Sequence, residues 1–289
     1  MKRLLRSTNI FQTQQLAEKY RSIFSAEDDT EFGDPSDIRL SGDTEADFQK
    51  VVELLRDTSY EDLGPALEDI VNDPKLYALL SEGFGNGELA EVDMSSSTVA
   101  IPVTQLLPSQ SEIGLDNSLS YPLKQDCSNL FNSPVTIVSP IITYRKTFII
   151  DGHHRWSQLY MMNPSAKINA INFNYNEQSP YRALRNFQGA IAVTHKEVPK
   201  SYSRVNNVYD MSEAEIEKYI DSNMEDVCWN SLVKQGVCED RDSAIEYILE
   251  NVMELRRDNP PFANAPDREY MPQTNEKSIE IAEEGQTNI

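Results

Sequence analysis

The stretch IIDGHHRWS, residues 149–157, decides how the central part of this chain folds. It opens with two β-branched isoleucines, which favour a strand, and Asp151 and Gly152 follow where such a strand would end. Apolar and aromatic side chains then recur at the spacing of one helix face: Trp156, Leu159 and Tyr160. The order predicts a strand that passes through an Asp-Gly turn directly into a helix.

Two of the chain's three histidines are adjacent in this stretch, which raises the question of a metal site. Neighbouring residues on a helix diverge by about 100°, so His153 and His154 cannot easily share one ion. Asp151 could join one of them, but His195 lies far along the chain. We therefore expect no metal held by these side chains alone. A divalent ion that arrives with a nucleotide needs fewer protein ligands and fits better.

A phosphate-binding turn agrees best with the local pattern. A helix that starts directly after a strand presents backbone N–H groups and the positive end of its dipole to an anion. Gly152 lets the backbone approach closely, and His153, His154 and Arg155 add donors, of which the planar guanidinium suits phosphate best. Asp151 could accept a proton from a hydroxyl nucleophile or help to hold Mg²⁺.

Two other interpretations of the same residues stay open. A hydrolytic triad is poorly supported, because Ser157 lacks a Gly-x-Ser-x-Gly context and no cysteine lies near a histidine in the sequence. The simplest alternative has no chemistry: Asp151 caps the helix, and both histidines lie with satisfied hydrogen bonds on its first turn.

The charge of the chain limits its partners. Acidic residues outnumber basic ones by 47 to 26, and the net charge of −21 opposes non-specific binding to DNA and to anionic membranes. No run approaches the roughly 20 apolar residues of a membrane span, and residues 1–24 lack the apolar core of a signal peptide. We expect a soluble intracellular protein, or one packaged inside an intracellular particle.

The cysteines indicate the same environment. Three cysteines do not make a disulfide framework, and their odd number indicates a reducing compartment. The spacing between Cys228 and Cys238 matches no common zinc motif. We interpret Cys127, Cys228 and Cys238 as structural thiols.

Hydrophobic periodicity predicts an α+β chain with four consecutive regions. They are a helical N-terminal region (1–97) with an acidic linker (25–47), an α+β domain (98–200), a helical C-terminal region (201–257) and an extended or disordered tail (258–289). We expect strands at 98–103, 134–139, 147–150 and 166–175. We expect helices at 8–24, around 65–71 and 75–80, at 155–163, 181–195 and 243–257, and one after a capping box formed by Ser212 and Glu215.

The segment from about residue 98 to 175 resembles the ParB/sulfiredoxin fold, which occurs in partition proteins, free serine kinases and many phage proteins. Three stretches carry the resemblance: IPVTQLLPSQSEI (101–113), SPVTIVS (133–139) and IIDGHHRWSQLY (149–160). It implies a small mixed-sheet domain whose Gly-x-x-Arg turn binds nucleotide phosphates. It also implies ATP or ADP as ligand, with Mg²⁺.

Members of that family with different activities differ at this turn, so the residues of this chain can be compared with each of them. Sulfiredoxin has its catalytic cysteine where this chain has His153, which argues against sulfinic-acid reduction. Partition proteins usually have Gly-Glu-Arg-Arg and a basic DNA reader, which the acidic composition disfavours. The Asp-Gly-His-His-Arg of the serine kinases is the most similar version. That resemblance implies a catalytic group of Asp151, Glu112 and His153, and a phosphate cradle of Gly152, His153, His154 and Arg155.

Three functions follow as hypotheses. The first is a phage-encoded nucleotide-binding protein with phosphotransferase or NTPase activity. The second is a structural or cargo component of a phage virion that retains the fold without catalysis, docked to protein partners through its helical regions and tail. The third is a DNA-binding protein or nuclease, which the net charge of −21 disfavours. The resemblance places the protein in the host-cell cytoplasm or the virion interior.

Overall fold

The computed structural model describes residues 59–78, 95–131, 140–174 and 206–271 and a few isolated positions outside these ranges. The chain forms two compact units, each assembled from segments that are distant in sequence. The first unit comprises residues 1–24, 97–172 and 203–264, and the second comprises 25–96, 173–202 and 265–289. The four consecutive regions expected from the sequence stay a prediction.

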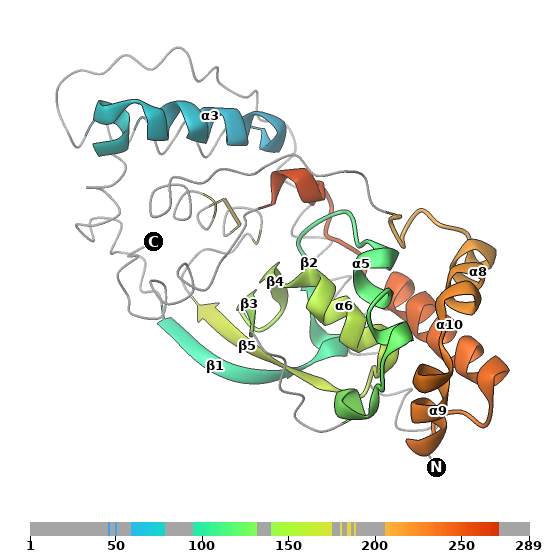
Figure 1. Cartoon of the computed structure of the whole chain (residues 1–289). Helices are drawn as coiled ribbons and strands as arrows, with labels where there is room; N and C mark the ends of the chain where they lie inside the picture. The colour runs from blue at the N-terminus through green and yellow to red at the C-terminus, as the bar shows by residue number, and fades with distance from the viewer. Residues whose placement is uncertain are drawn as a thin grey trace. The chain divides into compact units, whose positions relative to one another are not determined.

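Among the described residues, five strands form one mixed sheet in the order β1-β5-β3-β4-β2. They are β1 (Ser95–Pro102), β2 (Leu107–Pro108), β3 (Ile141–Tyr144), β4 (Phe148–Asp151) and β5 (Lys167–Asn174). β2 runs parallel to β4, whereas β3 and β4 form an antiparallel hairpin. Helices accompany this sheet in the same chain, so the α+β class predicted from the sequence is confirmed (Figure 1).

The β3–β4 hairpin closes through a two-residue turn at Arg145 and Lys146. Arg145 and Lys146 both have positive φ, 53° and 54°, which is the geometry of the turn that matches strand twist. Thr147 N–H donates to the Tyr144 carbonyl at 3.1 Å and closes the turn. The Asn172 side chain of β5 accepts from the Lys146 N–H, so a neighbouring strand supports the strained residue.

Helix α6 (His153–Met162) is the central helix of the first unit. It starts two residues before the predicted 155–163, and its apolar side chains are almost wholly buried: Trp156, Leu159, Tyr160, Met161 and Met162. The Trp156 indole donates to the Val103 carbonyl at 2.8 Å, which satisfies its only polar group. Helices α5 (Leu115–Leu119) and α10 (Arg241–Asp258) pack against α6 (Figure 1).

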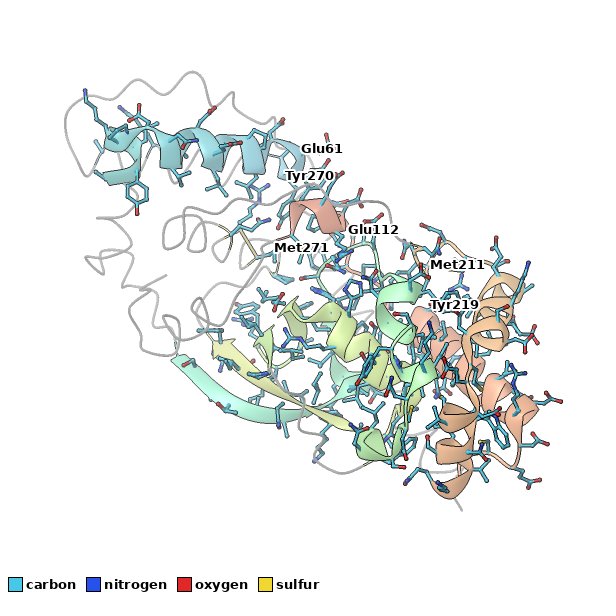
Figure 2. The ribbon with its side chains drawn as sticks, in the orientation of Figure 1. Glu61, Glu112, Met211, Tyr219, Tyr270 and Met271 are labelled. Carbon is cyan, nitrogen blue, oxygen red and sulfur yellow. The ribbon has the colours of Figure 1, made fainter. Side chains whose placement is uncertain are left out.

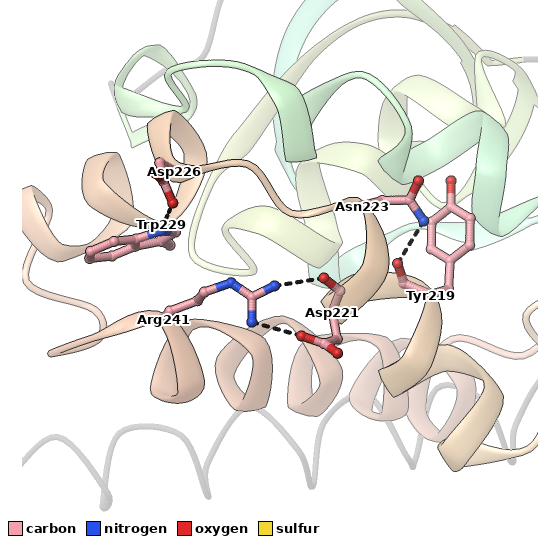
Figure 3. Close-up of polar contacts among 6 residues, drawn as sticks. All are labelled: Tyr219, Asp221, Asn223, Asp226, Trp229 and Arg241. Atoms are coloured by element: carbon pink, nitrogen blue, oxygen red, sulfur yellow. Dashed lines mark hydrogen bonds and ion pairs between the residues drawn. The ribbon is translucent and has the colours of Figure 1, made fainter.

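Three helices follow in the first unit: α8 (Glu213–Asn223), α9 (Asp226–Lys234) and α10. The predicted capping box of Ser212 and Glu215 is confirmed at the start of α8, and α10 contains the predicted helix 243–257. Arg241 binds the Asp221 carboxylate at 2.7 Å and joins the start of α10 to the end of α8 (Figure 3). The Asn251 amide donates to the Met161 carbonyl at 2.8 Å and fastens α10 to α6.

Short 3-10 helices fill the connections. They are η2 (Val103–Gln105), η3 (Pro122–Lys124), η4 (Ser128–Phe131) and η5 (Arg268–Tyr270). Residues 259–264 are irregular but packed in the first unit, where the Asn259 amide donates to the Leu106 carbonyl at 2.7 Å. Phe262 lies edge-on to Phe148, with ring centroids 6.4 Å apart. The start of the predicted tail is therefore ordered in this structure.

The second unit contains α3 (Tyr60–Asn72), which includes the helix predicted around 65–71. Ser59 caps it by accepting from the Asp62 N–H at 3.1 Å, and its buried face carries Leu63, Leu67 and Ile70. Residues 74–78 are also helical, within the predicted 75–80 region. The Arg185 guanidinium lies over the Tyr60 ring, 4.7 Å from its centroid.

Several predictions fall on residues that the structure does not describe. They are the helix at 8–24, almost all of the acidic linker 25–47, the strand at 134–139, most of the helix at 181–195 including His195, and the tail beyond 271. Within the described segments, no helix is both long and apolar enough to cross a membrane.

Candidate functional site

The candidate site lies where two parallel strands end side by side. Leu107 pairs with Phe148 and Pro108 with Ile149, so β2 and β4 reach the same edge of the sheet together. β2 continues into the loop of residues 109–114, which we call the β2 loop, and β4 continues into Asp151 and Gly152. The carboxyl edge of parallel strands is where open α/β sheets commonly bind ligands. The β2 loop contains Glu112, labelled in Figure 2.

Gly152 is the N-cap of α6 and has a left-handed backbone, with φ 94° and ψ 24°. A Cβ at this position would lie 2.5 Å from Ile141 Cγ2 and 2.9 Å from Arg155 Nη2. Both the backbone angle and the lack of space therefore require glycine here. Within the described part of the chain, no side chain caps this helix, so the expectation that Asp151 caps it is wrong. The other part of that alternative is confirmed, because both histidines on the first turn accept hydrogen bonds.

Asp151 instead pairs with Arg155, one helical turn further on. Asp151 Oδ2 lies 2.9 Å from Arg155 Nη2, and Arg155 Nη1 donates to the Pro140 carbonyl at 2.7 Å. The two side chains are 24% and 28% exposed, so solvent reaches the pair from one side. The arrangement fixes the plane of the guanidinium beside the start of α6.

His153 points into the protein rather than toward solvent. Its Nε2 accepts a hydrogen bond from the Ser109 N–H at 3.0 Å, which requires a neutral ring with its proton on Nδ1. Burial lowers the pKa of His153 well below its usual value, and electrostatic interaction with His154 and Arg155 lowers it further. Ser109 Oγ donates to the Ile149 carbonyl, so β4, the histidine and the β2 loop form one buried network.

His154 contacts the other end of the β2 loop. Its Nε2 accepts from the Gly114 N–H at 3.4 Å. Close by, the hydroxyls of Ser118 and Ser157 are 2.7 Å apart, and Ser118 Oγ donates to the Gly114 carbonyl at 2.8 Å. The two adjacent histidines thus point in different directions, as expected for a helix. They accept hydrogen bonds from Ser109 and Gly114, the two ends of the β2 loop.

The β2 loop is also held from its outer side by Asn207, a residue that the sequence did not single out. Asn207 Oδ1 accepts from the Ile113 N–H at 3.0 Å, and its Nδ2 donates to the Ser111 carbonyl at 3.4 Å. These two bonds enclose Glu112, which is partly buried between them. Asn207 and Ile113 are 94 positions apart, and neither periodicity nor a short motif connects them.

The structure therefore brings together the two segments that the sequence selected. The β2 loop with Glu112 lies against the first turn of α6, where Gly152, His153, His154 and Arg155 follow Asp151. Among the described residues, no group of three or more His, Cys, Asp or Glu side chains could hold a metal ion. Asp151 offers one carboxylate, which suits Mg²⁺ brought by a nucleotide rather than a metal bound by protein ligands alone.

Comparison of the chain with protein-family models, with curated proteins and with solved structures found no match.

Proposed function

We propose that this chain binds the phosphate groups of a nucleotide at the turn between β4 and α6, in the manner of a ParB/sulfiredoxin-like domain. One observation carries the proposal: a strand edge leads through a left-handed Gly152 into a buried helix, with Arg155 fixed beside the turn. The first-turn N–H groups of a helix have no acceptor within the helix, and the helix dipole adds positive potential there.

Each neighbouring residue has a role in this proposal. Arg155 supplies a charged planar donor, already oriented by the Pro140 carbonyl. His153 and His154 act chiefly by positioning the β2 loop, because their Nε2 atoms accept from Ser109 and Gly114. The ring of His153 is buried and does not face solvent.

The two carboxylates define the chemistry that the site could perform. Bound Mg²⁺ would neutralise charge on the terminal phosphates of ATP. Asp151, which Arg155 holds at 2.9 Å, would accept the proton of an attacking hydroxyl group or water. Glu112, on the enclosed β2 loop, would orient that nucleophile. The activity proposed is phosphoryl transfer or nucleotide hydrolysis.

A thermal-shift measurement with ATP and ADP, each with and without Mg²⁺, tests the binding. A nucleotide at a hundred times its Kd stabilises a protein by about 2.7 kcal/mol, which corresponds to a rise in Tm of about 5 °C or more for a chain of this size. We expect that rise in the wild-type protein and its loss in Arg155→Ala.

Arg241→Ala is the matched control for Arg155→Ala. Arg241 also pairs with one aspartate, at 2.7 Å, and donates to one backbone carbonyl, but it lies at the α8–α10 junction (Figure 3). The control should keep the nucleotide-dependent rise even if its own Tm falls. A wild-type protein that no nucleotide stabilises would contradict the proposal and favour a structural role in a particle.

A further inference from the structure

Two of the three cysteines lie side by side in the interior of the first unit. Cys127 lies between η3 and η4, and Cys228 lies in the first turn of α9, 101 positions further along the chain. Their Sγ atoms are 3.8 Å apart, and the residues are only 1% and 0% exposed. The close pair is a product of the fold, because nothing in the local sequence connects the two positions.

We propose that Cys127 and Cys228 are an oxidative modification site, at which a reversible intramolecular disulfide joins the η3–η4 segment to α9. A disulfide needs an Sγ–Sγ distance of about 2.05 Å, so the two sulfur atoms must approach by less than 2 Å. The proposal concerns a site separate from the nucleotide turn and does not depend on it.

The backbones that carry the two thiols are already held together. Cys127 N–H donates to Ser231 Oγ at 3.0 Å, and Ser231 Oγ donates to the Cys228 carbonyl at 2.7 Å. Glu225 N–H, at the start of α9, donates to the Leu123 carbonyl in η3 at 2.9 Å. These bonds restrict the motion of both segments, so side-chain rotation can close most of the remaining distance.

The two thiols differ in their surroundings and in the direction in which their pKa values are shifted. A hydrogen bond from Cys228 lowers the pKa of Cys127 despite its burial, whereas the same neighbour and burial raise the pKa of Cys228. Cys127 also lies in the short segment between η3 and η4, next to exposed residues, so an oxidant reaches it before Cys228, and we assign it as the attacking thiol. Gln125 and Asp126 beside it are exposed, so opening of the short η3–η4 segment would admit an oxidant.

The oxidant is a small disulfide, for which oxidised glutathione is the probe. The Cys127 thiolate attacks one glutathione sulfur, forms a mixed disulfide and releases one glutathione thiolate. Cys228 then loses its proton to solvent and attacks Cys127 Sγ, which expels the second glutathione. Two protein thiols are oxidised by two electrons in total, and one glutathione disulfide is reduced to two thiols.

The test is incubation of the folded full-length chain with oxidised glutathione, followed by non-reducing peptide mass spectrometry. We expect a peptide pair joined through Cys127 and Cys228, a loss of two hydrogens from the intact mass, and reversal by dithiothreitol. Cys238→Ser is the control variant and should give the same cross-link. Cys228→Ser should instead accumulate one glutathione on Cys127.

The Tm supplies a second readout in the wild-type protein, which avoids reliance on a variant that fails to fold. Closure of a loop of about 100 residues should raise Tm by several degrees over the reduced protein. The proposal is overturned by a Cys228–Cys238 link, by a dimer linked through these thiols, or by no cross-link under conditions in which the unfolded chain reacts.

Discussion

Gly152 is the residue on which the geometry of the candidate site depends most. Its φ of 94° is rarely adopted by any residue with a side chain, and the space above its Cα is occupied by Ile141 and Arg155. Any substitution there must move a β3 side chain or displace the guanidinium that we assign to phosphate binding. The same residue therefore sets both the turn and the position of Arg155.

Gly152→Ala should lower the free energy of unfolding by about 2–4 kcal/mol, because backbone strain and overpacking add together. Gly236→Ala is a matched control, since Gly236 also has positive φ, 71°, but has nothing within 4 Å of an added Cβ. Gly236→Ala should lower the free energy of unfolding only through backbone strain, by about 1 kcal/mol. Urea unfolding of both variants measures the difference, and equal losses would show that the space above Gly152 is not restricted.

His153 should make stability depend on pH in a defined window. Its pKa in the folded protein is lowered by burial, so below pH 6.5 the unfolded chain binds a proton that the folded one does not. The contribution of neutral His153 to the free energy of unfolding is therefore fully present above about pH 6.5. It falls by up to about 1.4 kcal/mol per pH unit as the solution becomes more acidic.

Comparison with His153→Gln isolates this contribution, because glutamine cannot titrate and its side-chain oxygen can accept from Ser109 N–H. We expect unfolding free energies measured between pH 7 and 5 to fall more steeply for the wild-type protein than for the variant. Parallel curves would show that His153 is protonated equally in both states.

At the scale of elements, the β2 loop is the part of the site that depends on distant segments. α6 holds it through two histidines, and residues 206–208 hold it from the other side, where Asn207 forms an isolated antiparallel β-bridge with Gly114. Val208 N–H donates to the Ile113 carbonyl at 2.9 Å, which adds a backbone bond to the side-chain bonds of Asn207. Glu112 is positioned by contacts on both sides of the loop.

Asn207→Ala should loosen this loop without unfolding the unit. The Ile113 amide loses its acceptor at 3.0 Å, so its hydrogen exchange should accelerate by about tenfold, the equivalent of one hydrogen bond of about 1.4 kcal/mol. Asn206→Ala is the control, because the Asn206 side chain contacts only Asp116 at 3.3 Å among the described residues, and its backbone bond to Leu115 remains. Equal exchange at Ile113 in both variants would remove the proposed role of Asn207.

Local patterns were sufficient to predict most of the elements around the site. The strand, the Asp-Gly turn and α6 follow from residues that are consecutive, and the Ser212 capping box needs only four positions. The short strand β2 was missed, because two residues carry no periodicity and its pairing with β4 is set by tertiary contacts. The inward direction of His153 was missed for the same reason, since its partner Ser109 is 44 positions away.

At the scale of the whole molecule, segments from both sides of residue 200 build the first unit. Residues 97–172 supply the sheet and α6, and residues 203–264 supply Asn207 and the three helices α8, α9 and α10. Asn251 of α10 donates to the Met161 carbonyl of α6, so the regions expected at 98–200 and 201–257 are in contact within this unit. A sequence pattern identifies where elements begin, but not which distant elements share a core.

The net charge of −21 bears on the function at this scale. A strongly acidic molecule repels polyphosphates at long range, so a nucleotide would have to be held by local donors at the turn. Arg155 and the first-turn amides of α6 supply such donors, so nucleotide binding is tested most directly at these groups.

That test is a titration of the isotopically labelled full-length chain with ATP and Mg²⁺, followed by the backbone amide resonances. We expect saturable shifts at the amides of His153, His154 and Arg155 at the start of α6, and their loss in Arg155→Ala. Unchanged resonances at these three amides with millimolar nucleotide, or saturable shifts confined to other parts of the chain, would contradict a phosphate-binding turn between β4 and α6.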